Sequence, residues 1–267
     1  MSLYIFQFFS IIYKIEIIFG SIVFVYNRIE MSRQSQQQKR NVRIISIDGN
    51  IGSGKSTLVA DLKDRLGNDK NICFLQEPVD LWNTIRDEND VTILENYYKD
   101  QVKYAFTFQM MAYISRLSML KKEINKNKYD IIITERSTNT DRYVFAKMLY
   151  DEKKIDKIQY EIYLKWFDEF ISEIPQIEVI YIRTFPHVAH ERVKKRAREG
   201  ESVIELEYLK RCHEYHENWL MKKERGLSLV FDGNVNIYDE PKVLENWIDI
   251  IKNYIYDNII EDYNDGV

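Results

Sequence analysis

The sequence predicts a three-layer α/β fold, in which a five-stranded parallel sheet is flanked by helices on both faces. Three observations lead to this prediction. The 267 residues are 45% apolar and 30% charged, which is ordinary for a globular protein and enough for one sizeable core. Short apolar runs alternate with long helical patterns, and the first run leads into a glycine-rich loop. Strands that alternate with helices favour a parallel sheet, because the helices serve as the crossover connections.

The expected strands are short apolar runs bounded by polar or turn-forming residues. They cover residues 42–47, 72–75, 130–134, 178–182 and 229–231. With nine glycines, four prolines and no internal repeat, the chain shows no hinge between two domains. We therefore expect one domain over residues 41–267. Ligands of such sheets gather at the carboxyl ends of the strands, so the functional residues are sought there.

Residues 1–40 are expected to form an N-terminal extension and linker. The apolar stretch 3–26 is divided by Lys14 and Glu16 into runs shorter than the roughly 20 residues that span a membrane. It has neither the basic start of a signal peptide nor the Arg- and Ser-rich composition of a transit peptide. We favour either a mispredicted start, in which case the protein would begin at Met31, or a dispensable extension. A cytoplasmic protein is expected, and a mitochondrial or membrane anchor stays open.

Charge and cysteine content narrow the possible partners. The formal net charge of -4 gives no global basic field for a nucleic-acid polymer, so an anionic ligand must be held by a local cluster of positive groups. Cys73 and Cys212 are the two cysteines, and they have no metal-ligand spacing. We expect a small phosphate ligand, a reducing compartment and no catalytic cysteine.

The strongest motif follows the first expected strand and precedes a helix over 56–66. Its letters, G-N-I-G-S-G-K-S, fit the phosphate-binding P-loop pattern G-x-x-x-x-G-K-[ST]. Lys55 is expected to reach the β- and γ-phosphates of ATP, and the Ser56 hydroxyl to coordinate Mg²⁺. The fold is therefore predicted to be that of a P-loop NTPase. The expected ATP-binding loop comprises Gly49, Asn50, Ile51, Gly52, Ser53, Gly54, Lys55, Ser56 and Thr57.

Residues 127–130 spell N-K-x-D, the pattern with which GTPase switches read guanine. They precede the third expected strand, which is the wrong end for a contact with a base at the carboxyl edge of the sheet. Turn composition alone explains them.

Two acidic segments follow the second and third expected strands. Glu77 precedes a proline, which biases it away from helix and lets its carboxylate face the phosphate loop as a general base. Glu135 and Arg136 follow the third strand, which would place an acid near Mg²⁺ and a guanidinium near the transferred phosphate. A surface ion pair is the alternative for Glu135 and Arg136, but convergence on one sheet edge favours a site.

A helix expected over 102–122 carries polar residues on one face. Gln109, Ala112 and Arg116 recur at spacings of three, four and seven residues, and Tyr98 falls near this face if the helix starts early. The Gln109 amide offers a donor and an acceptor to a nucleobase edge. Phe108 and Phe145 are candidates for stacking on the base. Alternatively, Arg116 lies on the solvated side of the helix and the aromatic residues belong to the core.

The segment 192–198 ends a helix with five basic residues and is followed by Glu199, Gly200 and Glu201. This composition predicts a basic lid over phosphates. A solvated helical face is the alternative, because basic residues also suit a helix C-terminus.

In this order along the chain, the motifs resemble the deoxynucleoside kinase family, which includes deoxycytidine, deoxyguanosine and mitochondrial thymidine kinases. The resemblance covers about residue 42 to the C-terminus. It is carried by the P-loop 49–57, Glu77-Pro78-Val79, Phe108-Gln109, Glu135-Arg136-Ser137, Asp141-Arg142-Tyr143 and the arginines at 196 and 198. It implies phosphorylation of the 5′-hydroxyl of a deoxyribonucleoside with ATP and Mg²⁺, in nucleotide salvage. We also expect a homodimer and no nucleic-acid partner.

The resemblance also implies residue roles. Glu77 would be the base on the 5′-hydroxyl, with Arg136 beside it and Lys55 on the phosphates, and Ser56 and Glu135 would hold Mg²⁺. The nucleoside pocket would contain Glu77, Trp82, Tyr98, Phe108, Gln109, Ala112, Arg116, Arg136, Asp141, Phe145 and Glu201. Arg192, Arg196 and Arg198 would surround the ATP phosphates, and residues 232–236 the adenine.

The pair of Arg116 and Asp141 resembles the deoxycytidine and deoxyguanosine kinases, because thymidine-preferring members have Ala at the position of Asp141. We therefore expect purine deoxynucleosides or deoxycytidine, and little activity on thymidine. Gly200 and Glu205 depart from the family, which has an acidic residue and a proline at these positions. The alternatives are a nucleoside monophosphate kinase of the thymidylate kinase type and a non-catalytic nucleotide-binding module.

Overall fold

The computed structural model of the protein describes residues 40–196, 201, 203–222 and 226–264. The predicted extension therefore lies almost entirely outside the described residues, as do Arg198 and Gly200. The residues from Asn41 onward form one compact unit. Within the described ranges, no helix is both long and apolar enough to cross a membrane.

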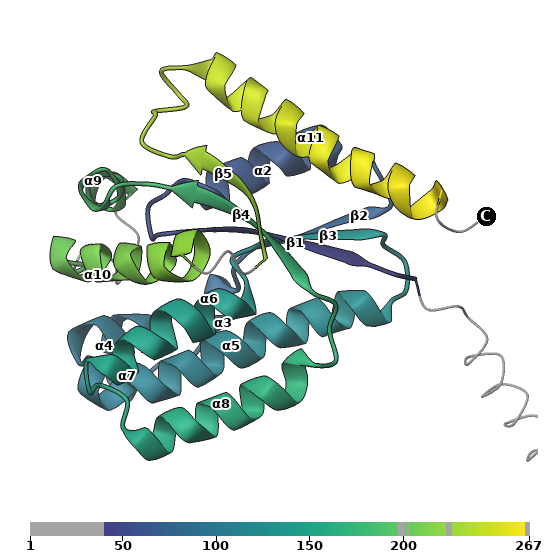
Figure 1. Ribbon diagram of the computed structural model, residues 1–267. Helices are drawn as coiled ribbons and strands as arrows, with labels where there is room; N and C mark the ends of the chain where they lie inside the picture. The colour runs from purple at the N-terminus through teal and green to yellow at the C-terminus, as the bar shows by residue number, and fades with distance from the viewer. Residues whose placement is uncertain (1–39, 197–200, 202, 223–225, 265–267) are drawn as a thin grey trace, which may run out of the picture. The chain divides into compact units, whose positions relative to one another are not determined.

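All five predicted strands are present and pair in parallel. The sheet order is β2-β3-β1-β4-β5 (Figure 1). The strands are β1 (Arg43–Gly49), β2 (Ile72–Leu75), β3 (Ile131–Glu135), β4 (Ile177–Arg183) and β5 (Leu227–Asp232). The fold prediction is confirmed. β1 lies in the centre, so the loop that follows it emerges between its neighbours β3 and β4.

Helices cover both faces of the sheet (Figure 1). α2 (Lys55–Leu66) and α11 (Pro241–Asn264) pack on one face, and α5 (Gln101–Asn125) and α8 (Lys157–Ile171) lie on the other side. Alternate residues of β1 serve the two faces: Ile45 and Ile47 pack in the cluster that contains Leu58, and Ile44 in the cluster that contains Leu120. Burial on both sides explains why the strands read as continuous apolar runs.

Short helices gather at the edge of the sheet where the strands end (Figure 1). They are α3 (Val79–Asn83), α4 (Ile93–Lys99), α6 (Thr138–Thr140), α7 (Lys147–Asp151), α9 (Pro186–Arg196) and α10 (Leu206–His216), together with two π-helical turns, η1 (Asp141–Ala146) and η2 (Glu217–Met221). They surround the carboxyl edge that the sequence predicted as the ligand-binding edge.

The helix expected over 102–122 is α5, and the earlier start that would have included Tyr98 does not occur. Asp100 begins α5 as its N-cap, with an extended φ of -142° and its side chain accepting from Lys103 N at 3.1 Å. Tyr98 consequently belongs to α4 and not to an early turn of α5. The break follows from the capping chemistry of Asp, which stabilises a helix start at that point. Tyr98 still reaches the cavity described below.

Candidate functional site

A cavity of about 650 Å³ lies at the carboxyl edge of the sheet. The structure brings together there every residue predicted to contact the acceptor, from Glu77 on the loop after β2 to Glu201 beyond α9. The P-loop from Ile51 to Thr57 lines the same cavity. A single cavity thus reaches from the phosphate loop to the predicted nucleoside pocket.

The P-loop is held in shape by its own backbone and by α9. Gly52 has a φ of 77°, and a Cβ on it would lie 2.4 Å from the Ala189 carbonyl oxygen, so only glycine fits there. Lys55 Nζ donates to the Asn50 carbonyl across the loop at 2.7 Å. Burial, followed by the positive charge of Arg136, lowers the pKa of Lys55 to about 7. The loop is therefore closed around an amine whose positive charge an anionic ligand would stabilise.

Gly49 and Asn50 differ from the rest of the predicted ATP-binding loop, because they do not line the cavity. The Asn50 side chain donates to the Leu209 carbonyl at 2.8 Å and accepts from Ile51 N at 2.9 Å. The Gly49 carbonyl accepts from Arg136 Nη1 at 3.3 Å. These two residues therefore stabilise the loop on the side away from the cavity, and Asn50 connects it to α10.

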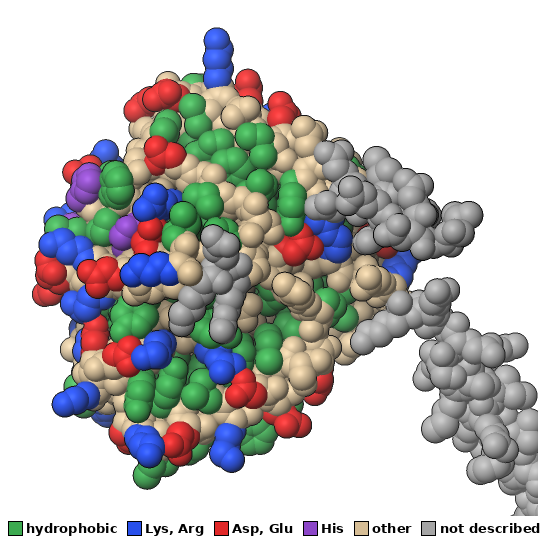
Figure 2. Space-filling model, in the orientation of Figure 1, with side chains coloured by type: hydrophobic (Ala, Val, Ile, Leu, Met, Phe, Trp, Pro, Cys, Tyr) green, Lys and Arg blue, Asp and Glu red, His purple; other side chains and the backbone are tan. Residues whose placement is uncertain are grey.

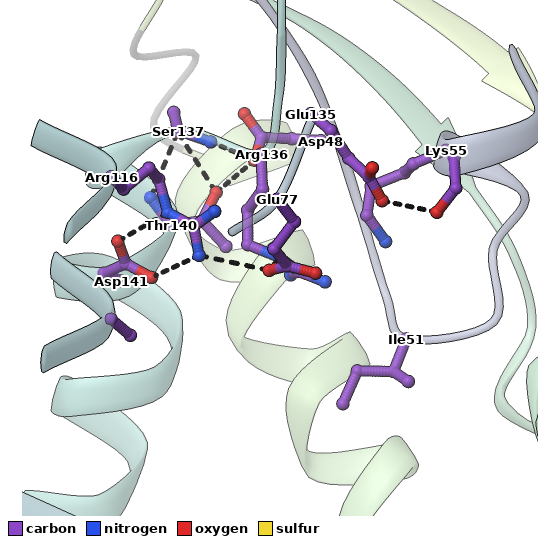
Figure 3. A network of polar contacts seen from close by, with 12 residues as sticks. Asp48, Ile51, Lys55, Glu77, Arg116, Glu135, Arg136, Ser137, Thr140 and Asp141 are labelled. Atoms are coloured by element: carbon purple, nitrogen blue, oxygen red, sulfur yellow. Dashed lines mark hydrogen bonds and ion pairs between the residues drawn. The ribbon is translucent and has the colours of Figure 1, made fainter. Parts of the chain in front are cut away.

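Glu77 lies between two arginines (Figure 3). Its Oε1 accepts from Arg136 Nε and from Arg116 Nη2, each at 3.1 Å. Burial by itself would raise the pKa of Glu77, but the charges of Arg136, Arg116 and Lys55 outweigh it and lower the pKa to about 2. The carboxylate is therefore ionised at neutral pH and faces a cavity that also contains the P-loop lysine.

Arg116 is buried, with 7% of its surface exposed, so the alternative that placed it on the solvated side of its helix is wrong. It donates to Asp141 through Nε at 3.0 Å and through Nη2 at 3.3 Å, and its guanidinium lies 5.6 Å from the ring centre of Trp82. Among the described residues, Arg116 Nη1 and the buried Oε1 of Gln109 have no hydrogen-bond partner. Unsatisfied buried polar atoms in a cavity are a cue for a polar ligand.

The end of the cavity predicted to contact the sugar contains Tyr98 and Glu201. Arg196 Nη2 donates to Glu201 Oε2 at 2.5 Å. Burial, followed by the neighbouring Tyr97 and Glu201, raises the pKa of Tyr98 well above its ordinary value, so its hydroxyl remains a donor. The structure thus places the Arg196 guanidinium, a carboxylate and a neutral phenol around one end of the pocket.

Two further tyrosines, which the sequence analysis did not identify as site residues, also line the cavity near Tyr98. Tyr97 and Tyr208 share a hydrogen bond of 2.9 Å between their hydroxyls, and both are buried. The bond joins α4 to α10 across 111 residues of chain. No local pattern separates these tyrosines from ordinary core residues.

The loop after β5 lines the opposite end of the cavity. The lining residues run from 233 to 238, so Asp232, the first residue predicted to contact adenine, is not among them. Its carboxylate instead accepts from Asn234 N at 3.0 Å and from Asn234 Nδ2 at 2.6 Å, which closes the turn. Arg192 donates to the carbonyls of Gly233 at 2.7 Å and Val235 at 2.9 Å. Arg192 therefore fastens this loop to α9.

Ser56 and Glu135 are adjacent at the phosphate end. Ser56 Oγ donates to Glu135 Oε1 at 2.5 Å, and both residues line the cavity. A hydroxyl and a carboxylate oxygen are ligands that Mg²⁺ accepts, with phosphates and water completing its shell. The described residues contain no cluster of three or more His, Cys, Asp or Glu that would hold a metal by itself. The donor set fits a Mg²⁺ ion that arrives with a nucleotide.

Comparison with known proteins gives consistent matches. The family model for deoxynucleoside kinase matches residues 45–256. A probable deoxycytidine kinase of Fowlpox virus is 40% identical over 179 residues, which cover 66% of this chain and 71% of the relative. Deoxycytidine kinase 2 of Gallus gallus is 33% identical over 250 residues, 83% of this chain and 93% of the relative. Mitochondrial thymidine kinase 2 of Homo sapiens is 33% identical over 189 residues, 70% of this chain and 68% of the relative.

Proposed function

Since the chain belongs to the deoxynucleoside kinase family and is therefore a deoxynucleoside kinase, we propose that ATP is its phosphoryl donor, with Mg²⁺ as the metal. We propose further that purine deoxynucleosides or deoxycytidine are better acceptors than thymidine. One observation carries this assignment. The ionised Glu77 carboxylate lies in a single cavity that reaches from the P-loop to the Arg116–Asp141 pair.

Glu77 is the residue proposed to act on the acceptor hydroxyl. In the cavity it is bound to Arg136 and Arg116, which fix the direction of its carboxylate. A pKa of about 2 makes it a weak base. Phosphoryl transfer passes through a loose transition state in which the hydroxyl becomes strongly acidic late, so positioning by Glu77 contributes more than early proton removal.

The developing negative charge is proposed to be neutralised by residues already at the phosphate end. Lys55 and Arg136 line the cavity there, and Arg196, which is paired with Glu201, lines the same cavity. Ser56 and Glu135 would hold Mg²⁺, which supplies charge neutralisation between the β- and γ-phosphates when bound. The P-loop backbone amides orient the donor phosphates. The chain's own part is thus to align the donor and acceptor and to stabilise charge.

The base preference is argued from the Arg116–Asp141 pair. Both partners are buried, and Gln109 Oε1 and Arg116 Nη1 have no partner within the described parts of the chain. An acceptor and a donor on the same wall match a base edge that offers both, as every nucleobase edge of this kind does, so these atoms indicate a base without excluding thymine. A charged pair at that wall would crowd the apolar methyl group of thymine.

A nucleoside monophosphate kinase is less well supported by the same contacts. An acceptor phosphate would require unpaired cations, whereas Arg116 and Arg136 are already paired with Glu77 and, for Arg116, with Asp141. Tyr98 and Glu201, at the predicted sugar end, suit the neutral hydroxyl of a nucleoside.

We also propose that the protein is a homodimer through α8. Ile158, Ile162 and Trp166 recur every four residues on this helix and are 71%, 40% and 49% exposed. The spacing puts them on one stripe of the helix. Ile114, 47% exposed, extends the apolar surface onto the neighbouring helix α5. A stripe of this kind on a long helix fits the same stripe of a second copy across a two-fold axis.

No nucleic-acid polymer is proposed as a partner. Acidic and basic side chains are interspersed over the face seen in Figure 2, and the net charge is -4. Binding to a phosphate backbone requires a contiguous basic surface.

The test is a phosphoryl-transfer assay with the full chain, Mg-ATP and each of the four deoxynucleosides in turn. We expect the monophosphate product with deoxycytidine, deoxyguanosine or deoxyadenosine, and a kcat/KM for thymidine at least about tenfold lower. A preference for thymidine would contradict the base argument. Phosphorylation of dTMP or dCMP in place of nucleosides would support the monophosphate-kinase alternative.

A further inference from the structure

The buried carboxylate of Asp48 has no part in the proposed reaction. Asp48 lies at the end of β1, immediately before the P-loop, and is completely buried. It does not line the cavity. Its carboxylate nevertheless accepts hydrogen bonds from three groups, namely the hydroxyls of Ser46 and Thr140 and the backbone amide of Ser137.

Two of these bonds end beside residues of the proposed site. Ser137 N donates to Asp48 Oδ1 at 3.1 Å, and Ser137 directly follows Arg136. The Thr140 hydroxyl donates to the same oxygen, and Thr140 directly precedes Asp141. Figure 3 shows this arrangement, in which Asp48, Ser137 and Thr140 lie close to Arg136 and Asp141. One carboxylate oxygen therefore holds both ends of the four-residue segment between the two site residues.

The near end of the segment needs such support because the backbone of Arg136, which directly precedes it, is strained. Arg136 has a φ of 66°, in the left-handed region that non-glycine residues rarely adopt. A conformation of this kind persists only where surrounding contacts determine it. The conformation aims the Arg136 guanidinium at Glu77, 3.1 Å away, and at the Gly49 carbonyl, 3.3 Å away. The next residue's amide is the group that Asp48 binds.

The far end of the segment has an equivalent arrangement. Thr140 is completely buried, and its hydroxyl also lies 3.1 Å from Ser137 Oγ. Asp141 begins the π-helical turn η1, which also carries Phe145 into the cavity. Thr140 is the residue directly before this turn, so its contact with Asp48 bears on where Asp141 points.

From these contacts we infer that Asp48 is a positioning residue, which fixes Arg136 for phosphoryl transfer and Asp141 for base selection through one carboxylate oxygen. The inference rests on the proposed function, because it assigns its consequences to the same site. In this role Asp48 connects β1, the strand that leads into the P-loop, to the acceptor pocket. Its effect should appear in both the turnover and the choice of nucleoside.

Four variants of the full chain test it. Asp48→Ala removes all three bonds. Asp48→Asn keeps an oxygen toward Ser137 and Thr140, and its amide faces the Ser46 hydroxyl, which can rotate to accept. Ser46→Ala removes only the 2.6 Å bond to Asp48 Oδ2, which does not reach the segment, and serves as the matched control. Thr140→Val removes the Thr140 hydroxyl, and with it the bond to Asp48 and the 3.1 Å contact with Ser137 Oγ, while the bond from the Ser137 amide to Asp48 stays and the volume changes little.

The readouts are kcat, KM and the ratio of kcat/KM between the preferred deoxynucleoside and thymidine, measured at a temperature below each variant's melting point. We expect Asp48→Ala to lower kcat on the order of 10- to 100-fold and to reduce the ratio, since small misplacements of catalytic groups have effects of this size. Asp48→Asn should recover most of both, and Ser46→Ala should match the wild type. Thr140→Val should raise KM and reduce the ratio several-fold with little change in kcat.

The ratio separates positioning from mere stability. A loss of folded protein lowers the apparent kcat for every nucleoside equally, so it leaves both KM and the ratio unchanged. An active wild type, combined with an unchanged ratio in Asp48→Ala and Thr140→Val, overturns the inference and leaves the proposed function intact. An inactive wild type removes the proposed function instead. If Asp48→Ala does not fold, the other two variants decide. Unchanged kinetics in Thr140→Val would contradict the inference. Large losses of kcat or of the ratio in Asp48→Asn would contradict it as well.

Discussion

Arg116 and Glu77 form an ion pair of 3.1 Å between Nη2 and Oε1, and the same Arg116 nitrogen lies 3.3 Å from Asp141 Oδ1. One arginine thus connects the residue proposed to act on the 5′-hydroxyl with the residue proposed to select the base. Because the contacts are buried, a change at the base end is transmitted to Glu77 with little screening by solvent. Base selection and turnover are therefore expected to be linked in this site.

Replacing Glu77 with Gln should lower kcat far more than it weakens nucleoside binding. The amide keeps the size of the side chain but loses the charge that orients the hydroxyl and the ability to take its proton, which is typically worth 10²- to 10⁴-fold in rate. Steady-state kinetics, with nucleoside affinity measured by calorimetry, check this. Unchanged turnover would remove Glu77 from the proposed role.

The same carboxylate should also make stability depend on pH. The pKa of Glu77 is lowered from 4.5 to about 2 in the folded protein, so its stabilising contribution is present above about pH 4.5 and is lost as the pH falls toward 2. The contribution amounts to about 3 kcal/mol at most. Urea unfolding between pH 6 and pH 3 should show the stability difference between wild type and Glu77→Gln shrinking as the pH falls. A difference independent of pH would show that the arginines do not lower this pKa.

Residue patterns were sufficient to predict the fold and the phosphate end of the site. Five short apolar runs gave the five strands, and the P-loop and Glu135-Arg136 stand directly at strand ends, where topology brings them together. The start of the helix expected at 102 is confirmed to within one residue, but the sequence left an earlier start open because Asp100 is compatible with both a helix interior and a cap.

The supporting contacts could not be predicted in the same way. Asn50 binds a carbonyl 159 residues away, and Tyr97 binds a hydroxyl 111 residues away. Such pairs depend on how α10 packs against the sheet edge and leave no local periodicity in the sequence. Asp48 is a comparable case, since a lone acid at the end of a strand resembles any turn residue.

The Arg116–Asp141 pair should be tested as a unit. Asp141→Ala leaves a buried guanidinium with only Glu77 as its ionic partner, so we expect a loss of roughly 3 kcal/mol or more in the free energy of unfolding. Adding Arg116→Met should recover most of that loss. The double variant should also gain activity on thymidine relative to the wild type. Chemical denaturation and kcat/KM for each nucleoside provide the measurements, and a double variant no more stable than Asp141→Ala would argue against the pairing.

The dependence of the rate on Mg²⁺ concentration should show whether Glu135 is a metal ligand. Glu135→Gln replaces a carboxylate ligand with a neutral amide, which binds a hard cation less well. We expect the Mg²⁺ concentration for half-maximal rate to rise several-fold at fixed ATP, and the effect to be partly overcome by excess metal. Ser172→Ala, on the exposed end of α8, serves as a control that should leave the Mg²⁺ titration unchanged. An unaltered titration in Glu135→Gln would exclude it as a ligand.

The proposed dimer can be tested at Trp166, the largest side chain of the exposed stripe on α8. Trp166 is 49% exposed in the single chain, so Trp166→Glu should alter the free energy of unfolding of a monomer by little, while placing two like charges close together across a two-fold interface. Sedimentation velocity should show a dimer for the wild type and a monomer for Trp166→Glu. Lys165→Glu makes the charge change on the adjacent, exposed residue of the same helix and should remain dimeric if the stripe is the interface. A monomeric wild type, or dissociation by both variants, would contradict an α8 interface.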